Sequence, residues 1–246
     1  IDLDDWMTIY CEARYGGYPD AMEEAWKLFR KTAYSSLYSY PRFTWQTVIP
    51  DQRRISKIDL SDDYLQAIRL YASCADELKS SELYRNDLIE FVSYYVAAKA
   101  ENFYKQALKD DSENRVLAAQ RNLQQTVDLL MDVDRLLASH PLYRLEEWVE
   151  LARNSGTTLQ EKDAYEANAK RLITSWGGIQ EDYAARFWSG LIKDYYIPRI
   201  QLYFTKDRDK IREWEEQWIT SPWSNSTTPF DDPVKAALNL IEKTNK

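Results

Sequence analysis

Residues that interrupt helices are scarce in this sequence. There are 6 Gly and 8 Pro among 246 residues, and the stretch from Asp51 to His140 contains neither. A stretch of that length without a breaker consists mostly of long regular elements. Its apolar residues recur at intervals of three and four, which is the period of an α-helix. The absence of breakers therefore predicts long helices in this part of the chain.

Histidine and cysteine are scarce as well. With one His and two Cys, a zinc or haem site built on these residues is excluded. Cys11 and Cys74 fit one long-range disulfide or two free thiols equally well, and both fall in helical patterns as small core residues. His140 precedes Pro141 at the expected end of a long helix, which favours a surface or helix-terminal imidazole. No phosphate-binding glycine loop and no G-x-S-x-G or H-E-x-x-H motif occurs, so we expect neither a cofactor nor a metal.

Excess positive charge and long apolar runs are also absent. The chain has 32 Lys+Arg against 40 Asp+Glu, a net charge of −8, and no cluster of basic residues. Nucleic acid and anionic membrane are therefore excluded as main partners, because both require concentrated positive charge. The richest apolar run, Phe91 to Ala98, is much shorter than the ~18 residues that a membrane-spanning helix needs.

Two long helices dominate the predicted fold. Apolar residues at helical spacing extend from about Ser81 to Asp110, and a second series extends from Val116 to Leu137. The short polar segment from Lys109 to Ser112 lies between them and supplies a candidate N-cap. We therefore expect the two helices to fold back on one another in antiparallel orientation.

Shorter helices are expected on both sides of this pair. They are marked by Gly16-Gly17 as a stop, Pro19 as a start, Leu65 to Tyr71, the Thr158/Glu161 capping box before Tyr165, Leu172 and Trp176, the series Ala184, Trp188, Leu191 and Tyr195, the charged stretch Asp207 to Thr220, and Asp232-Pro233. Pro41 to Ile58 fits an irregular segment or a short hairpin. The resulting prediction is an all-α, antiparallel bundle-like fold of about nine or ten helices, forming one domain over residues 1–246.

Aromatic residues suggest where a ligand could bind. The chain contains 9 Trp, 18 Tyr and 7 Phe, and most of them lie at core spacing. Trp176, however, directly precedes Gly177-Gly178, and Tyr183 is expected at the start of the next helix. Two rings beside loop backbone and polar residues could form one wall of a sugar pocket, since a pyranose stacks its C–H faces on aromatic rings. A purely structural helix connection is the alternative. Among the many carboxylates, no pair stands out as a catalytic dyad.

Two groups of motifs resemble a known family. They are Arg14-Tyr15-Gly16 with Pro19-Asp20-Ala21 and Trp26 near the start, and Thr174-Ser175-Trp176-Gly177-Gly178, Asp182-Tyr183-Ala184, Arg186, Trp188, Gly190-Leu191, Asp194-Tyr195-Tyr196 and Pro198-Arg199 further on, with Tyr165-Glu166 ahead of the second group. These motifs resemble the C-terminal region of the α-N-acetylglucosaminidases of glycoside hydrolase family 89. The resemblance spans residue 14 to about residue 204.

The resemblance implies a function divided between domains. Enzymes of this family remove terminal α-linked N-acetylglucosamine with retention of configuration, using two glutamates on a preceding (β/α)₈ barrel that this sequence lacks. The chain resembles the all-helical domain that packs against that barrel, so the resemblance places no catalytic residue here and implies a setting outside the cytoplasm, periplasmic or secreted in bacteria and lysosomal in animals. Sugar contact carries over to Trp176 and Tyr183. Tyr18 stands where some members have a His near the substrate. Contacts from the Gly178–Glu181 loop are not assigned.

Three hypotheses follow from these observations. The first is a helical domain that completes the pocket of an α-N-acetylglucosaminidase and is inactive alone. The second is a stand-alone helical module that binds a glycan or a protein. The third is a self-contained helical enzyme with its own pair of acids in a cleft. The first explains the aromatic residues, the lack of a dyad and the motifs together.

Overall fold

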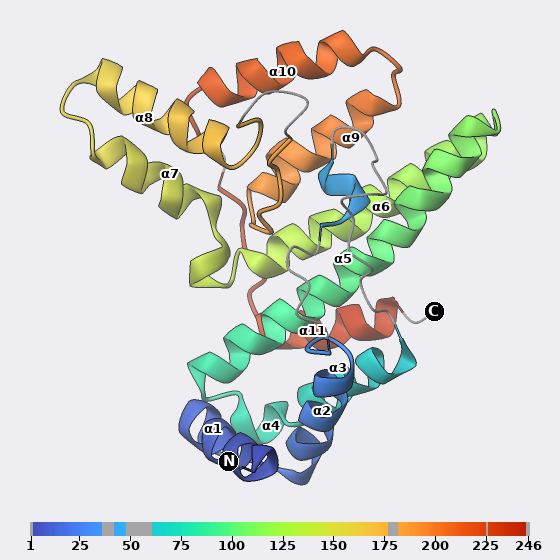
Figure 1. Cartoon of the computed structure of the whole chain (residues 1–246), viewed down its shortest axis with the longest axis vertical. Helices are drawn as coiled ribbons and strands as arrows, with labels where there is room; N and C mark the ends of the chain where they lie inside the picture. Colours follow the sequence, from blue (N-terminus) through green and yellow to red (C-terminus); the bar gives the residue numbers. More distant parts are fainter. Residues whose placement is uncertain (1, 36–41, 48–60, 177–181, 225, 245–246) are drawn as a thin grey trace. The chain divides into compact units, whose positions relative to one another are not determined.

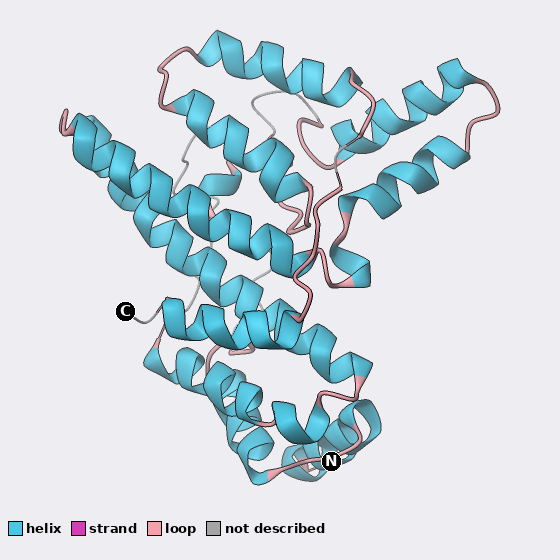
Figure 2. Cartoon of the chain, turned by 180° about the vertical axis from the view of Figure 1, so that it is seen from behind, coloured by secondary structure: helices cyan, strands magenta, loops and turns pink. Residues whose placement is uncertain are grey.

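The chain is helical throughout the part that the structure describes (Figure 1). The computed structural model describes residues 2–35, 42–47, 61–176, 182–224 and 226–244, with only the backbone of Arg208. These residues form eleven α-helices joined by loops, and none of them forms a strand (Figure 2). The predicted all-α class with two long helices is confirmed.

Two compact units make up the chain. Unit 1 comprises Ile1–Ser39, Lys57–Ala98 and Phe230–Lys246, and unit 2 comprises Tyr40–Ser56 and Lys99–Pro229. The longest helix, α5 (Glu82–Ser112), contributes its residues up to Ala98 to unit 1 and the remainder to unit 2. The expected single domain over residues 1–246 stays a prediction.

Unit 1 contains the helices at both ends of the chain. Besides the first part of α5, they are α1 (Leu3–Tyr15), α2 (Asp20–Lys31), α3 (Asp62–Ser73), α4 (Ala75–Leu78) and α11 (Pro233–Lys243). Helix α1 ends at Gly16, whose φ of 84° lies in the left-handed region that favours glycine. Helix α2 buries the face that the sequence predicts, namely Met22, Ala25, Trp26 and Phe29.

Aromatic rings fill the core of unit 1. The rings of Tyr71 and Tyr84 stack with centroids 4.9 Å apart, and Phe29 packs on Phe91 at 4.5 Å. The Tyr84 hydroxyl donates to the Tyr71 carbonyl at 2.7 Å, which satisfies its buried polar end. These aromatic residues of unit 1 therefore have a structural role, as their helical spacing in the sequence indicates.

Unit 2 is built on a pair of long helices and two helical hairpins. Helix α6 (Val116–Leu137) returns antiparallel along the second part of α5, as predicted (Figure 1). One hairpin pairs α7 (Leu145–Asn154) with α8 (Leu159–Leu172), and the other pairs α9 (Ile197–Tyr203) with α10 (Arg208–Thr220). Short 3-10 helices at Thr44–Gln46 and Pro141–Tyr143 and a π-helical turn at Ile192–Tyr196 complete the described elements of this unit.

The connection between α5 and α6 differs from the prediction. Helix α5 continues through Ser112, so Ser112 does not cap α6, whose N-cap is Arg115. Asp110 organises the turn instead: its Oδ1 accepts from Arg115 Nε at 3.0 Å and from Gln106 Nε2 at 2.8 Å, and its Oδ2 accepts from Asn122 Nδ2 at 2.8 Å. A carboxylate with charged and amide donors from both helices holds the turn without a side-chain cap.

His140 lies three residues beyond the end of α6 and is buried, with 5% exposure. Its Nδ1 accepts a hydrogen bond from the Leu142 backbone N–H at 3.1 Å, and its ring packs edge-on against Tyr143 with centroids 4.5 Å apart. The imidazole thus caps the 3-10 helix at Pro141–Tyr143. The sequence favours a surface or a helix-terminal imidazole, and the structure shows the helix-terminal one.

Candidate functional site

Trp176 and Tyr183 form a ring pair in unit 2. Trp176 follows the end of α8, and Tyr183 lies in a segment without regular secondary structure, residues 182–188, that leads to the π-helical turn. Their ring centroids are 5.0 Å apart with an interplanar angle of 75°, and each residue is 50% exposed. Two aromatic rings that are in contact yet accessible to solvent provide apolar surface for a ligand.

The exposure of Trp176 follows from the buried face of α8. The capping box of Thr158 and Glu161 begins this helix as predicted. Tyr165, Leu172 and Trp176, which the sequence pattern places on one face, are all exposed. The buried positions belong instead to Glu166 and Lys170, 2% and 1% exposed, whose Oε1 and Nζ are 3.0 Å apart. Because this ion pair faces the core, the apolar residues of α8 face solvent.

Further contacts tie this ion pair to the end of α10 and the residues just beyond it. Lys170 Nζ donates to the Trp218 carbonyl at 3.0 Å and to the Ser221 carbonyl, while Glu166 accepts from the Trp223 backbone N–H. Burial lowers the pKa of Lys170, and the Glu166 carboxylate opposes that shift. A buried ion pair with its remaining hydrogen bonds satisfied is tolerated in a core.

The segment that carries Tyr183 is not helical. The sequence predicts a helix through Ala184 and Trp188, whereas residues 182–188 have no regular secondary structure and helical structure begins only after Gly190. Arg42 explains the difference, because its Nε donates to the Ala184 carbonyl at 2.8 Å and its Nη1 to the Asp182 carbonyl at 2.9 Å. The hydroxyl of Tyr196 donates to the Arg186 carbonyl at 2.9 Å. Side chains therefore take the carbonyl groups that a helix would use internally.

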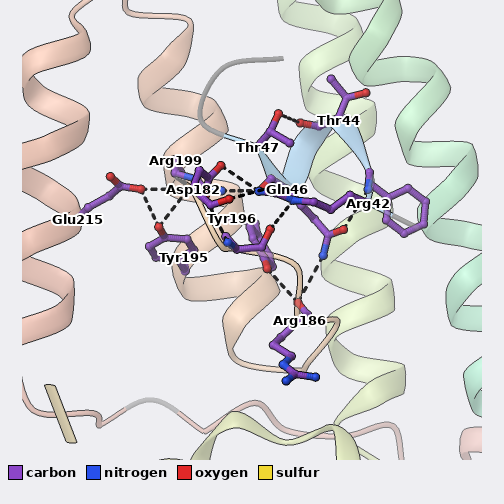
Figure 3. A network of polar contacts seen from close by, with 12 residues as sticks. Arg42, Thr44, Gln46, Thr47, Asp182, Arg186, Tyr195, Tyr196, Arg199 and Glu215 are labelled. Carbon is purple, nitrogen blue, oxygen red and sulfur yellow. Dashed lines mark hydrogen bonds and ion pairs between the residues drawn. The ribbon is translucent and has the colours of Figure 1, made fainter. Parts of the chain in front are cut away.

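Asp182 lies at the centre of a polar network, defined here as Arg42, Gln46, Asp182, Tyr195, Arg199 and Glu215 (Figure 3). Its Oδ2 pairs with Arg42 Nη2 at 3.0 Å, and its Oδ1 with Arg199 Nη1 at 3.3 Å. Arg199 Nη2 also donates to the Gln46 carbonyl at 2.6 Å. Two arginines from distant parts of the sequence thus hold one carboxylate.

Glu215 completes the charge balance of this Asp182 network, and Tyr195 forms a hydrogen bond with it. Arg199 Nη1 lies 3.0 Å from Glu215 Oε1, and the Tyr195 hydroxyl donates to the same oxygen at 2.6 Å. Arg199 is 1% exposed. Burial lowers its pKa, but the carboxylates of Asp182 and Glu215 outweigh burial and raise the pKa above its usual value. Arg199 is therefore charged at any physiological pH, and its charge is matched by the two acids.

Tyr18 lies in unit 1, between the C-cap of α1 and Pro19, the N-cap of α2. It is half-buried, and burial raises the pKa of its phenol. The neighbouring Arg14 is anchored by Asp87 through two hydrogen bonds, from Nε to Oδ2 at 2.7 Å and from Nη2 to Oδ1 at 2.6 Å. The Tyr15 hydroxyl also donates a hydrogen bond to Asp87 Oδ2 at 2.6 Å. The structure therefore brings Trp176 and Tyr183 together, and Tyr18 belongs to the other unit.

Among the described residues of unit 2, two carboxylic acids have a raised pKa, namely Asp134 and Asp194. Asp134 is fully buried, and its Oδ1 accepts from the Gly190 and Lys193 backbone N–H groups at 2.8 and 3.0 Å, while its Oδ2 accepts from Thr227 Oγ1 at 2.6 Å. Burial raises its pKa, and these hydrogen bonds oppose that shift. A carboxylate enclosed in this way ties α6 to the π-helical turn and is not placed to reach a substrate.

Neither metal-binding nor membrane-spanning features emerge in the described part of the chain. Within it, His, Cys, Asp and Glu side chains form no group of three or more that could hold a metal ion. Cys11 and Cys74 are buried free thiols, which answers the question that the sequence leaves open. The described helices include none that is long and apolar enough to cross a membrane. The Gly178–Glu181 loop, whose contacts the sequence leaves unassigned, lies outside the described residues.

Sequence reasoning missed the residues that support the ring pair. Arg42 and Gln46 lie in the stretch that the sequence leaves irregular or hairpin-like, and residues 42–47 contain a 3-10 helix that buries both side chains. Glu215 sits among other acids in a helix that the sequence predicts to be charged and solvated. An arginine next to a segment rich in aromatic and apolar residues, as in Pro41-Arg42-Phe43-Thr44-Trp45, is the one local signal that it is buried.

Comparisons with known proteins agree on one family. A sequence profile described as "Alpha-N-acetylglucosaminidase (NAGLU) C-terminal domain" matches residues 6–243. The human protein named alpha-N-acetylglucosaminidase is 28% identical in an alignment of 228 positions that covers 86% of this chain and 30% of the human one.

Solved structures from Clostridium perfringens share the fold. One, a family 89 glycoside hydrolase in complex with PUGNAc, has a TM-score of 0.84 and 23% identity, covering 98% of this chain and 31% of that chain. Another, in complex with its substrate GlcNAc-α-1,4-galactose, has a TM-score of 0.84 and 22% identity, with the same coverage of 98% and 31%. This chain thus spans about a third of the length of the relatives that it matches.

Proposed function

Because this chain belongs to the family of α-N-acetylglucosaminidase (NAGLU) C-terminal domains, we propose that its ring pair, Trp176 and Tyr183, completes the sugar pocket of a glycoside hydrolase. The substrate is a glycan with a terminal α-linked N-acetylglucosamine. The observation that carries the proposal is the ring pair itself: the ring centroids are 5.0 Å apart, and each of the two residues is 50% exposed.

The chemistry of a pyranose supports this role. Its axial C–H groups form apolar faces that stack on aromatic rings, and its hydroxyl groups bind polar groups at the rim of the same site. A ring pair at 75° offers a face from one residue and an edge from the other, which suits a flat apolar face and the adjoining acetamido methyl group. Binding of this kind positions the sugar and does not itself break the glycosidic bond.

The reacting carboxylates lie elsewhere in this proposal. The family resemblance implies two glutamates on a preceding (β/α)₈ barrel, acting as acid/base and nucleophile with retention of configuration. That barrel, part of the same polypeptide, is the partner of this chain. Within the described residues, the acids with a raised pKa are Asp134, which binds the π-helical turn, and Asp194, which lies within it. Tyr18 keeps its proposed place near the substrate by resemblance alone.

The direct test is Trp176→Ala in the full-length enzyme. We expect kcat/KM for an aryl α-N-acetylglucosaminide to fall about tenfold or more, since one aromatic stacking contact is worth on the order of 1.4 kcal/mol, with little change in Tm. Trp148→Ala is the matched control, because Trp148 is 45% exposed and also contacts one ring, that of Trp188. Equal activity in the Trp176→Ala enzyme and the Trp148→Ala enzyme would overturn the proposed role.

A further inference from the structure

We propose that Arg42 is a positioning residue for sugar binding, which holds the backbone on which Tyr183 is displayed. The inference rests on the proposed function, because it concerns how the ring pair reaches its place. Arg42 is 7% exposed, so it acts from behind the segment rather than by touching the sugar.

The backbone around Tyr183 is held by several hydrogen bonds. Arg42 donates to the carbonyls of Asp182 and Ala184 at 2.9 and 2.8 Å. The Ala184 N–H donates to Asp182 Oδ1 at 3.2 Å. The Tyr183 N–H donates to the Thr174 carbonyl at 2.9 Å, which connects the segment to the residues just before Trp176. Three consecutive residues are thus anchored while the ring between them stays half-exposed.

The geometry requires a guanidinium at position 42. Nε, Nη1 and Nη2 each reach a different acceptor: the Ala184 carbonyl, the Asp182 carbonyl, and Asp182 Oδ2 at 3.0 Å. A planar fork of donors can make these contacts at once. A lysine keeps the charge but offers one nitrogen, which cannot span the two carbonyls and the carboxylate together.

The rest of the Asp182 network holds the Asp182 side chain in the position from which it contacts Arg42. Arg199 binds the other carboxylate oxygen of Asp182, and its own charge is shared with Glu215. Two positive and two negative side chains therefore balance within the network, so loss of one partner leaves a buried charge unmatched. A loss of stability is expected for any such variant, and the test has to separate it from a loss of positioning.

The experiment uses Arg42→Lys in the full-length enzyme, with Asp182→Asn as a second variant that preserves shape and the acceptor for Ala184. For both we expect KM for the aryl α-N-acetylglucosaminide to rise about tenfold, equivalent to about 1.4 kcal/mol, while kcat changes less. The control is Asp110→Asn, which disrupts a similarly buried cluster at the α5–α6 turn, with Asp110 3% exposed. It should lower Tm and leave KM unchanged.

Hydrogen exchange tests positioning without the sugar. In Arg42→Lys, the peptide covering residues 182–188 should exchange about tenfold faster, since bonds worth on the order of 1.4 kcal/mol are lost. The peptide covering residues 189–194, whose amides of Gly190 and Lys193 bind Asp134, should keep its rate. Unchanged exchange in residues 182–188 would overturn the inference.

The outcomes distinguish the inference from the proposed function. If Trp176→Ala lowers kcat/KM and neither Arg42→Lys nor Asp182→Asn raises KM, the inference is wrong and the proposed function stands. If Trp176→Ala leaves kcat/KM unchanged and neither of the other two variants raises KM, the proposed function is wrong and the inference falls with it. Lower kcat/KM in Trp176→Ala and a higher KM in the other two variants, together with faster exchange in residues 182–188, support both.

Discussion

Among single residues, Asp194 has its own carboxylate in an environment that is unfavourable for a charge. Its Oδ2 is buried and finds no hydrogen-bond partner. Burial raises its pKa to about 6, with Asp134 adding to the shift and Lys193 opposing it. The folded state therefore binds the proton of Asp194 more tightly than the unfolded state does, where the pKa is about 3.9. Protonated Asp194 therefore contributes to the free energy of unfolding below pH ~4, and this contribution is lost as the pH rises through ~6.

Asp194→Asn should remove the loss of stability that ionisation of Asp194 causes at neutral pH. We expect the variant to match the wild type near pH 4 and to exceed its free energy of unfolding by about 1–2 kcal/mol at pH 7, a value reduced for partial solvent screening. Urea unfolding at a series of pH values measures the difference. A difference that stays constant between pH 4 and pH 7 would contradict the assignment.

The two cysteines provide a second prediction for single residues. Burial raises the pKa of Cys11 to about 12 and that of Cys74 to about 11. Both side chains are enclosed, with 0% and 4% exposure. We expect neither thiol to react with a thiol reagent at pH 8 in the native protein, because the thiolate is the reactive form. Both should react once urea unfolds the chain, and fast labelling before unfolding would show that the thiols are accessible.

Among the elements, helix α8 depends on its N-terminal cap. Thr158 Oγ1 accepts from the Glu161 N–H at 3.2 Å, and Glu161 Oε2 accepts from the backbone N–H groups of Thr157 and Thr158 at 2.8 and 3.0 Å. The hydroxyl and backbone N–H groups of Thr157 and the N–H of Thr158 lower the pKa of Glu161 to about 2. Thr158→Ala should cost about 1 kcal/mol in the free energy of unfolding, measured by urea unfolding, whereas Thr158→Ser should cost little. Equal losses in the two variants would show that the hydroxyl is not the stabilising group.

Local signals were enough to predict most of the helices. The cap of α8, the stop at Gly16 and the buried face of α2 depend on residues within a few positions of one another, so the sequence alone indicates them. The core face of α8 could not be predicted in this way. Counting apolar residues favours Tyr165 and Leu172, but the core accepts Glu166 and Lys170, because each neutralises the other.

The candidate site was predicted only in part, and for a related reason. Motif resemblance indicates Trp176 and Tyr183, and the structure places their rings in contact. The expected helix through Ala184 is wrong because Arg42, far away in the sequence, binds the backbone carbonyls of this segment. Local periodicity carries no information about such a distant donor, so the support of the site is visible only in three dimensions.

For the whole molecule, the chain is about a third of the length of its matched relatives. We expect the isolated chain to leave an aryl α-N-acetylglucosaminide intact, because the reacting carboxylates lie outside it in the proposed function. The full-length enzyme should hydrolyse the same substrate. Hydrolysis by the isolated chain would instead favour a helical enzyme with its own pair of acids.

A sugar titration of the isolated chain addresses the remaining alternative. One ring pair without the rest of a pocket buries little of a sugar, so calorimetry with N-acetylglucosamine should give no measurable heat. Clear binding would favour a stand-alone glycan-binding module over a domain that completes a pocket.

The buried side chains that hold the backbone of residues 182–184 are different from the exposed rings that are proposed to contact a ligand. These buried side chains carry two guanidinium groups and two carboxylates, all of them largely enclosed by the protein. If the ring pair contacts the sugar as proposed, we expect substitutions at positions 176 and 183 to change sugar selectivity without moving the backbone of residues 182–184, because its anchors lie in other side chains.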